Sequence, residues 1–392
     1  AAPRIALSGS VAASGEIAAD AGLPAWRTGL AAFEWTELTS SSIAGTPGLD
    51  GGSSSSGKVD AWTGLHIDPR TGEVYSVGQG GHDDYHGNEV DKLDLREDDP
   101  AWVQIEASSA SSAVTPAPDY EPYYSDGLAS SVHGYFTGIY VPSLNRAMRL
   151  WGGSSSESGN PMQEFTGYNT STQAWDARSV WETMTLPVGV SVSANAYAYA
   201  IHPDTEVVYC WLYNNKVVAW TPGLPGSLST IIASPSNPAV GATAAAIDPS
   251  RGDGGTMFML GGGAVVDGNL QVVCHALDIA TATRRAITLT GTDISSSASG
   301  CGMFWCAALD KYIVRVRETG GGGTIYGITP TTGSSWACAA ISTTGGGSIP
   351  ATNDALAGDA PYTKFLYAPT LGAAIYLPRY SSNVWALALH EV

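Results

Sequence analysis

Six times along this chain, an apolar run that ends in a polar turn is followed closely by a second apolar run. The first runs cover residues 63–69, 137–142, 199–204, 245–249, 304–310 and 365–369. The second runs cover residues 74–77, 147–151, 207–211, 257–260, 312–316 and 374–377. Repeated pairs of short strands belong to architectures in which one small unit is copied around or along the fold, so a repeat predicts the whole topology.

The composition favours strands and turns over surface helices. Glycine occurs 47 times, and only 14% of the residues are charged. Glycine runs end several of the second strands, at 80–81, 152–153, 261–263 and 320–323. Uneven spacing between the units is typical of long loops on a regular scaffold. The sequence therefore predicts an all-β fold built as a β-propeller.

One unit carries a family motif. Gly152-Gly153 is followed by Tyr168 and, after six residues, by Trp175. This order resembles the Kelch repeat, in which a glycine doublet ends the second strand and a Tyr and a Trp follow on the third and fourth. The first unit departs from it with Leu93 in place of the Tyr. The resemblance implies a propeller like the central domain of galactose oxidase. That enzyme's copper chemistry needs a Tyr–Cys cross-link, and no cysteine lies near Tyr85 or Tyr124.

The last unit contains only three strands, the third at residues 384–389. A strand at residues 33–38, which alternates apolar and polar residues, lies far upstream of the first complete unit. Pairing this strand with the last unit would leave no open edge in the ring. We therefore expect six blades in one domain covering residues 32–392, with residues 1–31 as an arm or anchor. Seven blades is the alternative.

The charge balance limits the choice of partner. The chain has 18 basic and 36 acidic residues, a formal net charge of −18. This charge disfavours nucleic acid as a partner. No apolar run is long enough to cross a membrane, so no membrane insertion is expected, and no signal peptide is visible. The five cysteines sit mostly in apolar runs, which favours buried thiols over disulfides.

Candidate chemistry concentrates in residues 78–90, where histidines and carboxylates crowd between two strands. In a propeller blade, the loop between second and third strands opens on the same face as the connection to the next blade. Residues 78–90 should therefore lie beside the connection at 120–133. His82, His86 and His133 would then suit a divalent metal ion, the possible cofactor. A purely structural loop is the alternative.

A site without metal would use the same two loops. Its expected catalytic residues, a set able to act as general acid and base, are His82, His133 and Tyr124. Its expected ligand-binding residues, carboxylate and aromatic groups suited to sugars, are Asp84, Tyr85, Tyr120 and Tyr123. Arg146 and Arg149 would neutralise a sugar carboxylate, but we expect both on the opposite face, near the first turn of their blade.

These features favour a binding or surface-display module for a glycan or cell-surface polymer. An Ala/Ser/Gly-rich arm suits attachment to a larger assembly, for example as a phage virion or attachment component. An extracellular or virion-surface location is expected. The alternative is an enzyme, either a polysaccharide lyase or a metal-dependent oxidase or hydrolase. Some ulvan lyases are propellers with His and Tyr at work, and this chain is similar to them only at that level.

Overall fold

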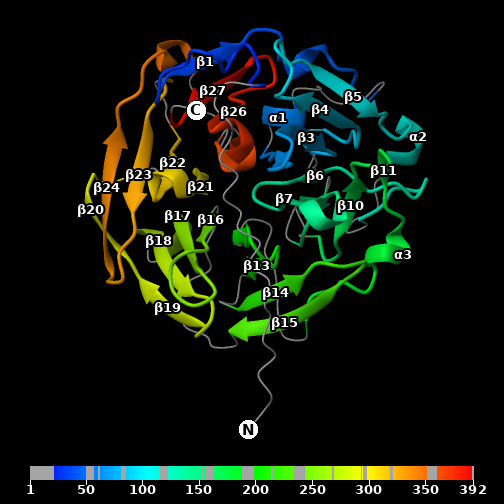
Figure 1. Cartoon of the computed structure of the whole chain (residues 1–392). Helices are drawn as coiled ribbons and strands as arrows, with labels where there is room; N and C mark the ends of the chain where they lie inside the picture. Colours follow the sequence, from blue (N-terminus) through cyan, green and yellow to red (C-terminus); the bar gives the residue numbers. More distant parts are fainter. Residues whose placement is uncertain are drawn as a thin grey trace.

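Six antiparallel sheets stand in a ring in the computed structural model of the chain (Figure 1). It describes residues 22–49, 57–60, 62–80, 85–114, 122–151, 154–155, 162–187, 198–212, 216–232, 243–266, 269–292, 294, 298–317, 321–350 and 360–390. Each sheet is one blade, so the protein is a six-bladed β-propeller, and the expected all-β fold is confirmed.

The blades follow the chain in order, each from its innermost to its outermost strand. Blade 1 has β2 (His66–Ile67), β3 (Glu73–Val77), β4 (Val90–Asp94) and β5 (Trp102–Glu106); blade 2 has β7 (Gly138–Val141), β8 (Arg146–Arg149), β10 (Thr166–Asn169) and β11 (Ala174–Trp175). Blade 3 has β12 (Ala198–Ile201), β13 (Val208–Trp211), β14 (Val217–Thr221) and β15 (Ser227–Ile232). Blade 4 has β16 (Thr243–Asp248), β17 (Thr256–Val266), β18 (Asn269–Asp278) and β19 (Thr283–Ala286).

The last two blades depart from this simple order. Blade 5 has β21 (Gly302–Cys306), β22 (Lys311–Arg315), β23 (Ile325–Thr329) and β24 (Ser335–Ile341), and β20 (Thr288–Gly291) adds a parallel fifth strand outside β24. Blade 6 has β25 (Phe365–Ala368), β26 (Ala373–Tyr376), β27 (Val384–Ala388) and, outermost, β1 (Trp35–Leu38). Short elements in the connections include α1 (Gly57–Asp60), α2 (Ser111–Val114), α3 (Arg178–Trp181) and the pair β6 (Val132–His133) and β9 (Ser154–Ser155).

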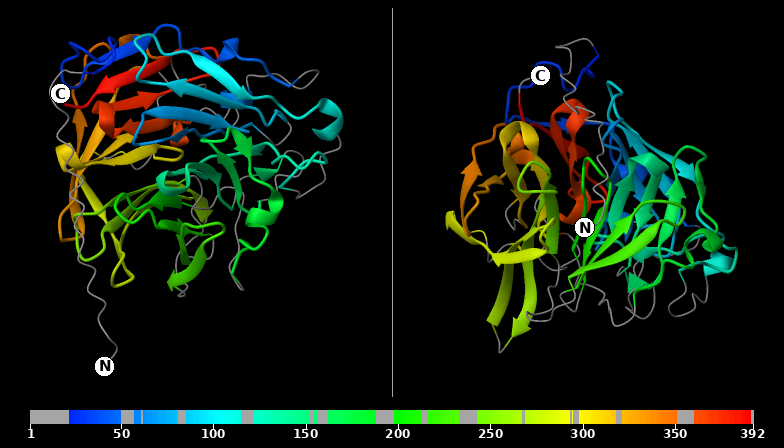
Figure 2. Two further views of the ribbon diagram at one scale, coloured as in Figure 1. Left: turned by 45° about the vertical axis from the view of Figure 1, so that its right-hand side comes forward. Right: turned by 60° about the horizontal axis from the view of Figure 1, so that its bottom comes forward.

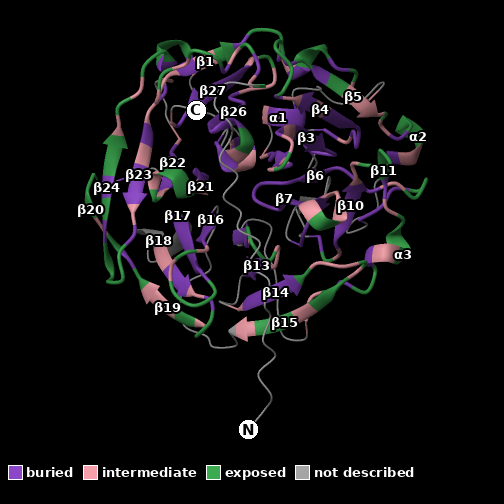
Figure 3. Ribbon diagram, in the orientation of Figure 1, coloured by how far each residue is buried: buried purple, intermediate pink, exposed green. Residues whose placement is uncertain are grey.

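The first strands of the blades line the centre. Each contacts the first strands of its two neighbours, and β25 of blade 6 contacts β2 of blade 1, which closes the ring. Burial follows the same plan, because inner strands are buried while the outer strands carry most of the exposed residues (Figure 3). The strands β17 and β18 are longer than the rest and form a projecting hairpin, yellow-green in Figure 2.

The N-terminal strand closes the ring as expected. β1 pairs antiparallel with β27, and Trp35 lies opposite Leu387. Trp35 is buried, and its indole N–H donates to the Gly323 carbonyl over 2.9 Å. A side chain at Gly323 would place its Cβ 2.5 Å from that indole nitrogen, so glycine is required where the chain passes Trp35.

The expected arm, residues 1–31, lies mostly outside the described residues, and its role stays a prediction. Its described end, residues 22–31, packs against blades 1 and 6. Trp26 donates to the Leu95 carbonyl over 2.9 Å, and Arg27 donates to the carbonyls of Leu371 and His390 over 2.9 and 2.6 Å. Leu95 follows β4, Leu371 lies in the turn between β25 and β26, and His390 follows β27. All three positions are on the face opposite the loop at residues 78–90, so residues 22–31 lie on that face.

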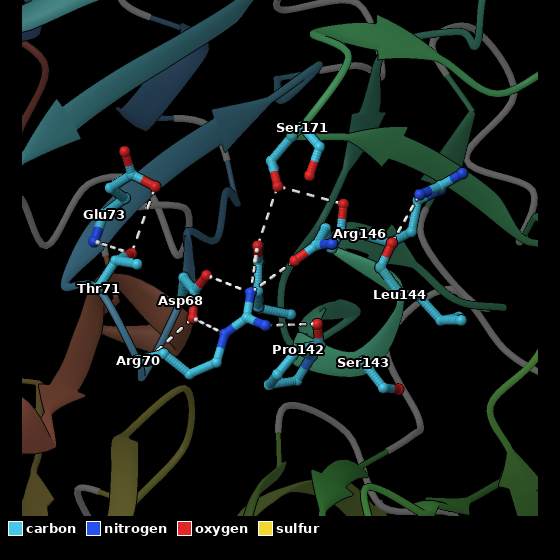
Figure 4. A network of polar contacts seen from close by, with 12 residues as sticks. Asp68, Arg70, Thr71, Glu73, Pro142, Ser143, Leu144, Arg146 and Ser171 are labelled. Carbon is cyan, nitrogen blue, oxygen red and sulfur yellow. Dashed lines mark hydrogen bonds and ion pairs between the residues drawn. The ribbon is translucent and has the colours of Figure 1, made fainter.

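On that opposite face, the turns between first and second strands of blades 1 and 4 are stabilised by hydrogen bonds to an aspartate at the start of the turn. In blade 1, Asp68 accepts hydrogen bonds from the backbone and side chain of Arg70, and Arg70 donates to the Pro142 carbonyl of blade 2 over 2.8 Å (Figure 4). In blade 4, Asp248 accepts from the Ser250 backbone in the same way. Aspartate followed by proline thus sets a turn in both blades.

The cysteines behave as the sequence indicates. None of the five forms a disulfide, and all but Cys274 are buried. Burial raises the pKa of the Cys210 thiol well above its ordinary value. No helix among the described residues is long and apolar enough to cross a membrane.

Candidate functional site

The two loops singled out in the sequence meet on one face of blades 1 and 2. Gly80 donates to the Val132 carbonyl over 3.0 Å, and Val132 donates to the Gly78 carbonyl over 3.1 Å. The Asn88 side chain donates to the Ala129 carbonyl over 2.8 Å. Residues 78–89 and 122–133 are therefore joined by backbone and side-chain hydrogen bonds. His82, Asp84 and Tyr120, which the sequence proposes for the site, lie outside the described residues.

The hydroxyls of two candidate tyrosines are used inside the protein. Tyr85 is fully buried; its hydroxyl donates to Glu89 and accepts from the Leu49 backbone N–H over 2.7 Å. The Tyr124 hydroxyl accepts from the Ser131 N–H over 3.0 Å and donates to the His86 carbonyl over 2.7 Å. Burial raises the pKa of both hydroxyls above the ordinary range. In this arrangement Tyr124 holds the two loops together, whereas Tyr85 joins the first loop to the segment at Leu49.

The two described candidate histidines lie in different surroundings. His133, on β6, is buried with its ring 4.7 Å from Trp62 and 5.8 Å from Tyr135. His86 is half-buried, and its Nδ1 atom has no hydrogen-bond partner in the described part of the chain. Among the described residues no three His, Cys, Asp or Glu side chains are placed to hold a metal ion. The metal site stays a prediction because His82 belongs to it.

The Tyr85 hydroxyl contacts Glu89, which belongs to a buried group of charged side chains that the sequence analysis did not identify as a group. Lys58 of α1 is 2.9 Å from Glu89 and 3.1 Å from Asp91 of β4, and all three side chains are at most 2% exposed. Lys58 also donates to the Pro47 carbonyl over 2.6 Å. Glu89 and Asp91 each keep one buried oxygen that accepts no hydrogen bond from any described residue. One cation therefore serves two carboxylates, and we call these residues the Lys58 cluster.

Because one buried lysine pairs with two buried carboxylates, the free energy of unfolding should depend on pH. Burial, with the charge of Glu89, raises the pKa of Asp91 to about 6, although Lys58 opposes the shift. The folded protein thus binds a proton more tightly than the unfolded chain does. The contribution of Asp91 to stability is complete below about pH 4 and is lost as the pH rises through 6.

Asp91→Asn should therefore stabilise the protein relative to wild type as the pH rises from 4 to 7.5. The gain in unfolding free energy is expected to reach at most about 3 kcal/mol, the equivalent of a two-unit shift. Urea unfolding at several pH values measures it. A difference between the two proteins that does not change with pH would contradict the raised pKa.

Aromatic residues gather on the loop face, where the connections enter the first strands of blades 1, 2 and 6. The Tyr135 ring is 5.5 Å from Tyr362, and Tyr362 is 5.3 Å from Phe136. Trp62, beside His133, is partly exposed. We call Trp62, His133, Tyr135, Phe136 and Tyr362 the aromatic mouth.

Three residues of the aromatic mouth have left-handed backbone conformations. The φ angles are 50° at Trp62, 43° at Tyr135 and 40° at Tyr362, each just before the first strand of its blade. Gly300 of blade 5, with φ 72°, accepts a hydrogen bond from Tyr362 N–H, just as Trp62 accepts one from Tyr135 N–H. Bulky residues in this conformation cost on the order of 1–3 kcal/mol each, and such strain concentrates at functional sites. Sequence spacing gives no sign of it.

Arg149 lies on the loop face, so the expectation that it sits on the opposite face is wrong. β8 runs away from the first turn of blade 2, which leaves Arg146 near that turn and carries Arg149 to the other end. Arg149 donates to the carbonyls of Gly78 and Ser130, each over 2.8 Å, at the ends of the two loops.

The strand pairings define the chain as a six-bladed β-propeller, so the expected resemblance to β-propellers is confirmed at the level of the fold. No protein-family model and no curated protein matches the sequence.

Solved structures similar to the chain differ in what they bind. One is an α-L-arabinanase from Penicillium chrysogenum complexed with arabinobiose, with 11% identity, 83% of this chain and 92% of that chain covered, and a TM-score of 0.43. A fungal alcohol oxidase of the AA5 family in complex with copper has 10% identity, 68% and 57% coverage and a TM-score of 0.35. YCF48 bound to D1 peptide has 11% identity, 93% and 99% coverage and a TM-score of 0.36. None of these likenesses bears on activity or ligand.

Proposed function

We propose that this propeller is a carbohydrate-binding module whose site is the aromatic mouth and the adjoining loops of blades 1 and 2. The observation that supports it is the aromatic mouth itself. Three aromatic residues keep strained backbone conformations at positions where glycine would be relaxed, as Gly300 shows. Such residues are retained for their side chains, and amphipathic rings are the groups on which sugar rings stack.

Trp62 is the residue expected to stack on the sugar. It is the partly exposed member of the aromatic mouth, whereas Tyr135, Phe136 and Tyr362 are at most 6% exposed. The buried rings fix the position of the Trp62 indole through His133. A rigid aromatic surface loses little conformational entropy when a ligand binds.

The attachment role fits the same geometry. The described end of the N-terminal arm is fixed on the face opposite the aromatic mouth, through Trp26 and Arg27. Attachment through that face would leave the loop face open to a glycan or cell-surface polymer. A surface-display or virion component would need this separation of the two faces.

Trp62→Ala should weaken glycan binding at least about tenfold, since aromatic residues at binding sites commonly contribute 2 kcal/mol or more. A glycan array would first identify ligands of the full chain, and calorimetry would then measure affinity. The matched control is Trp26→Ala, which removes a partly buried tryptophan from the opposite face and should leave affinity unchanged.

Equal affinities for the wild type and Trp62→Ala would reject the aromatic mouth as the site. Incubation of the wild type with the bound polysaccharide separates binding from catalysis. Release of unsaturated sugar would show a lyase, the enzyme class that His82, His133 and Tyr124 suggest from the sequence.

A further inference from the structure

Arg149 is a buried cation that pairs with no anion among the described residues. Its side chain is fully buried, and no carboxylate in the described part of the chain forms an ion pair with it. Burial lowers its pKa to about 10, a direct sign that the charge is poorly solvated. Arg146, on the same strand, shows the usual arrangement, with Asp176 at 2.8 Å.

The guanidinium of Arg149 is only partly satisfied. Nε donates to the Thr166 hydroxyl over 3.0 Å, and Nη1 donates to the carbonyls of Gly78 and Ser130. The third nitrogen, Nη2, is buried and donates to no acceptor in the part of the chain that the structure describes. Buried donors left without an acceptor are costly, and a charged donor is the most costly kind.

Other donors without acceptors surround this guanidinium. The Trp175 ring centre lies 4.6 Å from the guanidinium carbon, and its indole N–H has no acceptor among the described residues. Tyr123 is close enough for the charge of Arg149 to act on it, although burial, the larger cause, raises its pKa above the ordinary range; its buried hydroxyl has no hydrogen-bond partner in the described part of the chain. Both aromatic residues belong to one apolar cluster between blades 1 and 2. The described residues thus place three buried donors without acceptors here, and the carboxylates that act on Tyr123, Glu164 and Asp176, are paired with Arg178 and Arg146.

We propose that Arg149, Trp175 and Tyr123 form an anion site between blades 1 and 2, which binds one small anion. Two sources have the right chemistry: a free ion such as chloride, or the carboxylate of a sugar acid. The net charge of −18 disfavours a long polyanion and leaves a single charge as the better fit. Only the sugar-acid source rests on the proposed carbohydrate function.

Thermal unfolding of the full chain would test the site at a constant ionic strength of roughly 0.15 M, with sodium isethionate, a bulky sulfonate, replaced stepwise by sodium bromide or sodium formate. We expect a saturable rise in Tm of a few degrees at millimolar anion, because an anion that binds only the folded state stabilises it. Bromide soaked into crystals should give an anomalous peak beside Arg149.

Arg149→Lys keeps the charge but loses the planar fork, and should abolish the anion-dependent rise in Tm. The matched control is Arg315→Lys. Arg315 also ends a second strand, is buried and lies 4.3 Å from the Tyr376 ring. The Arg315→Lys variant should have a lower Tm than wild type but should keep the anion-dependent rise in Tm. If Arg149→Lys does not fold, the bromide peak in wild-type crystals decides the question alone.

Galacturonate and galactose distinguish the two sources of the anion. A rise in Tm with galacturonate but not with galactose, lost in Arg149→Lys, would assign the site to a sugar acid. A rise with bromide and formate alone would assign it to a free ion. No anion dependence, or the same dependence in Arg149→Lys, would overturn the proposal. Trp62→Ala tests the carbohydrate function separately, because Trp62 is not part of this site.

Discussion

Replacing Lys58 by methionine is expected to destabilise the propeller by about 3–5 kcal/mol at pH 7.5, the usual cost of removing one partner of a buried ion pair. Lys58 is the only cation that the Lys58 cluster offers to Glu89 and Asp91, and none of these side chains is more than 2% exposed. The variant would keep a side chain of similar length while leaving two carboxylates buried beside each other. Urea unfolding followed by circular dichroism measures the loss.

The loss should shrink at pH 5, because Asp91, with a pKa raised to about 6, is then mostly protonated. The matched control is Lys92→Met on β4, the strand that also carries Asp91. Lys92 is 27% exposed and pairs with Glu73 over 3.0 Å, so its loss should cost less than about 1 kcal/mol. Equal effects of the two substitutions would show that the Lys58 cluster is not closed to water.

The fold was predictable because short-range pattern and strand order determine it. Each predicted pair of runs became the first and second strand of a blade, and the isolated strand before the first unit became the outermost strand of blade 6. Closure left few choices, since an unpaired β27 would expose an edge. The parallel strand β20 was not predicted, because residues 288–291 carry no apolar alternation that separates them from a loop.

The candidate site was predictable only to the level of loops. Strand order fixes which loops share a face, and residues 78–89 and 122–133 do meet there. The direction of a side chain is a different matter. Both tyrosines point inward because their hydrogen-bond partners lie there. Tyr85 contacts Glu89 and the Leu49 N–H. Tyr124 contacts the Ser131 N–H and the His86 carbonyl. Spacing along the sequence does not encode these contacts.

Arg149 shows how a small error in position changes the interpretation. Arg146 and Arg149 are three residues apart in one strand, which separates them by about 10 Å at the usual rise per residue. In a strand that joins two faces of a blade, this distance is enough to move a side chain from one face to the other. The sequence analysis expected both arginines of β8 near the first turn of blade 2, whereas only Arg146, the first residue of the strand, lies there.

Trp35→Ala should cost about 3–5 kcal/mol in unfolding free energy, the range found for large aromatic side chains removed from a core. Trp35 is 3% exposed and joins two blades, because it lies on the strand that closes blade 6 and its indole rests against Gly323 and Gly346 beside blade 5. Those glycines approach the indole closely, so its removal would leave a cavity between blades 5 and 6. Chemical unfolding measures the loss.

Glu37→Ala is the control on the same strand. Glu37 is exposed and accepts a hydrogen bond from Asn383 over 2.9 Å, so its loss should stay within about 0.5 kcal/mol, as for most surface changes. Trp35→Phe should recover part of the loss by refilling the space, but not the hydrogen bond to Gly323. If Trp35→Ala proved as mild as Glu37→Ala, β1 would contribute little to closure, and blade 6 would be stable with three strands.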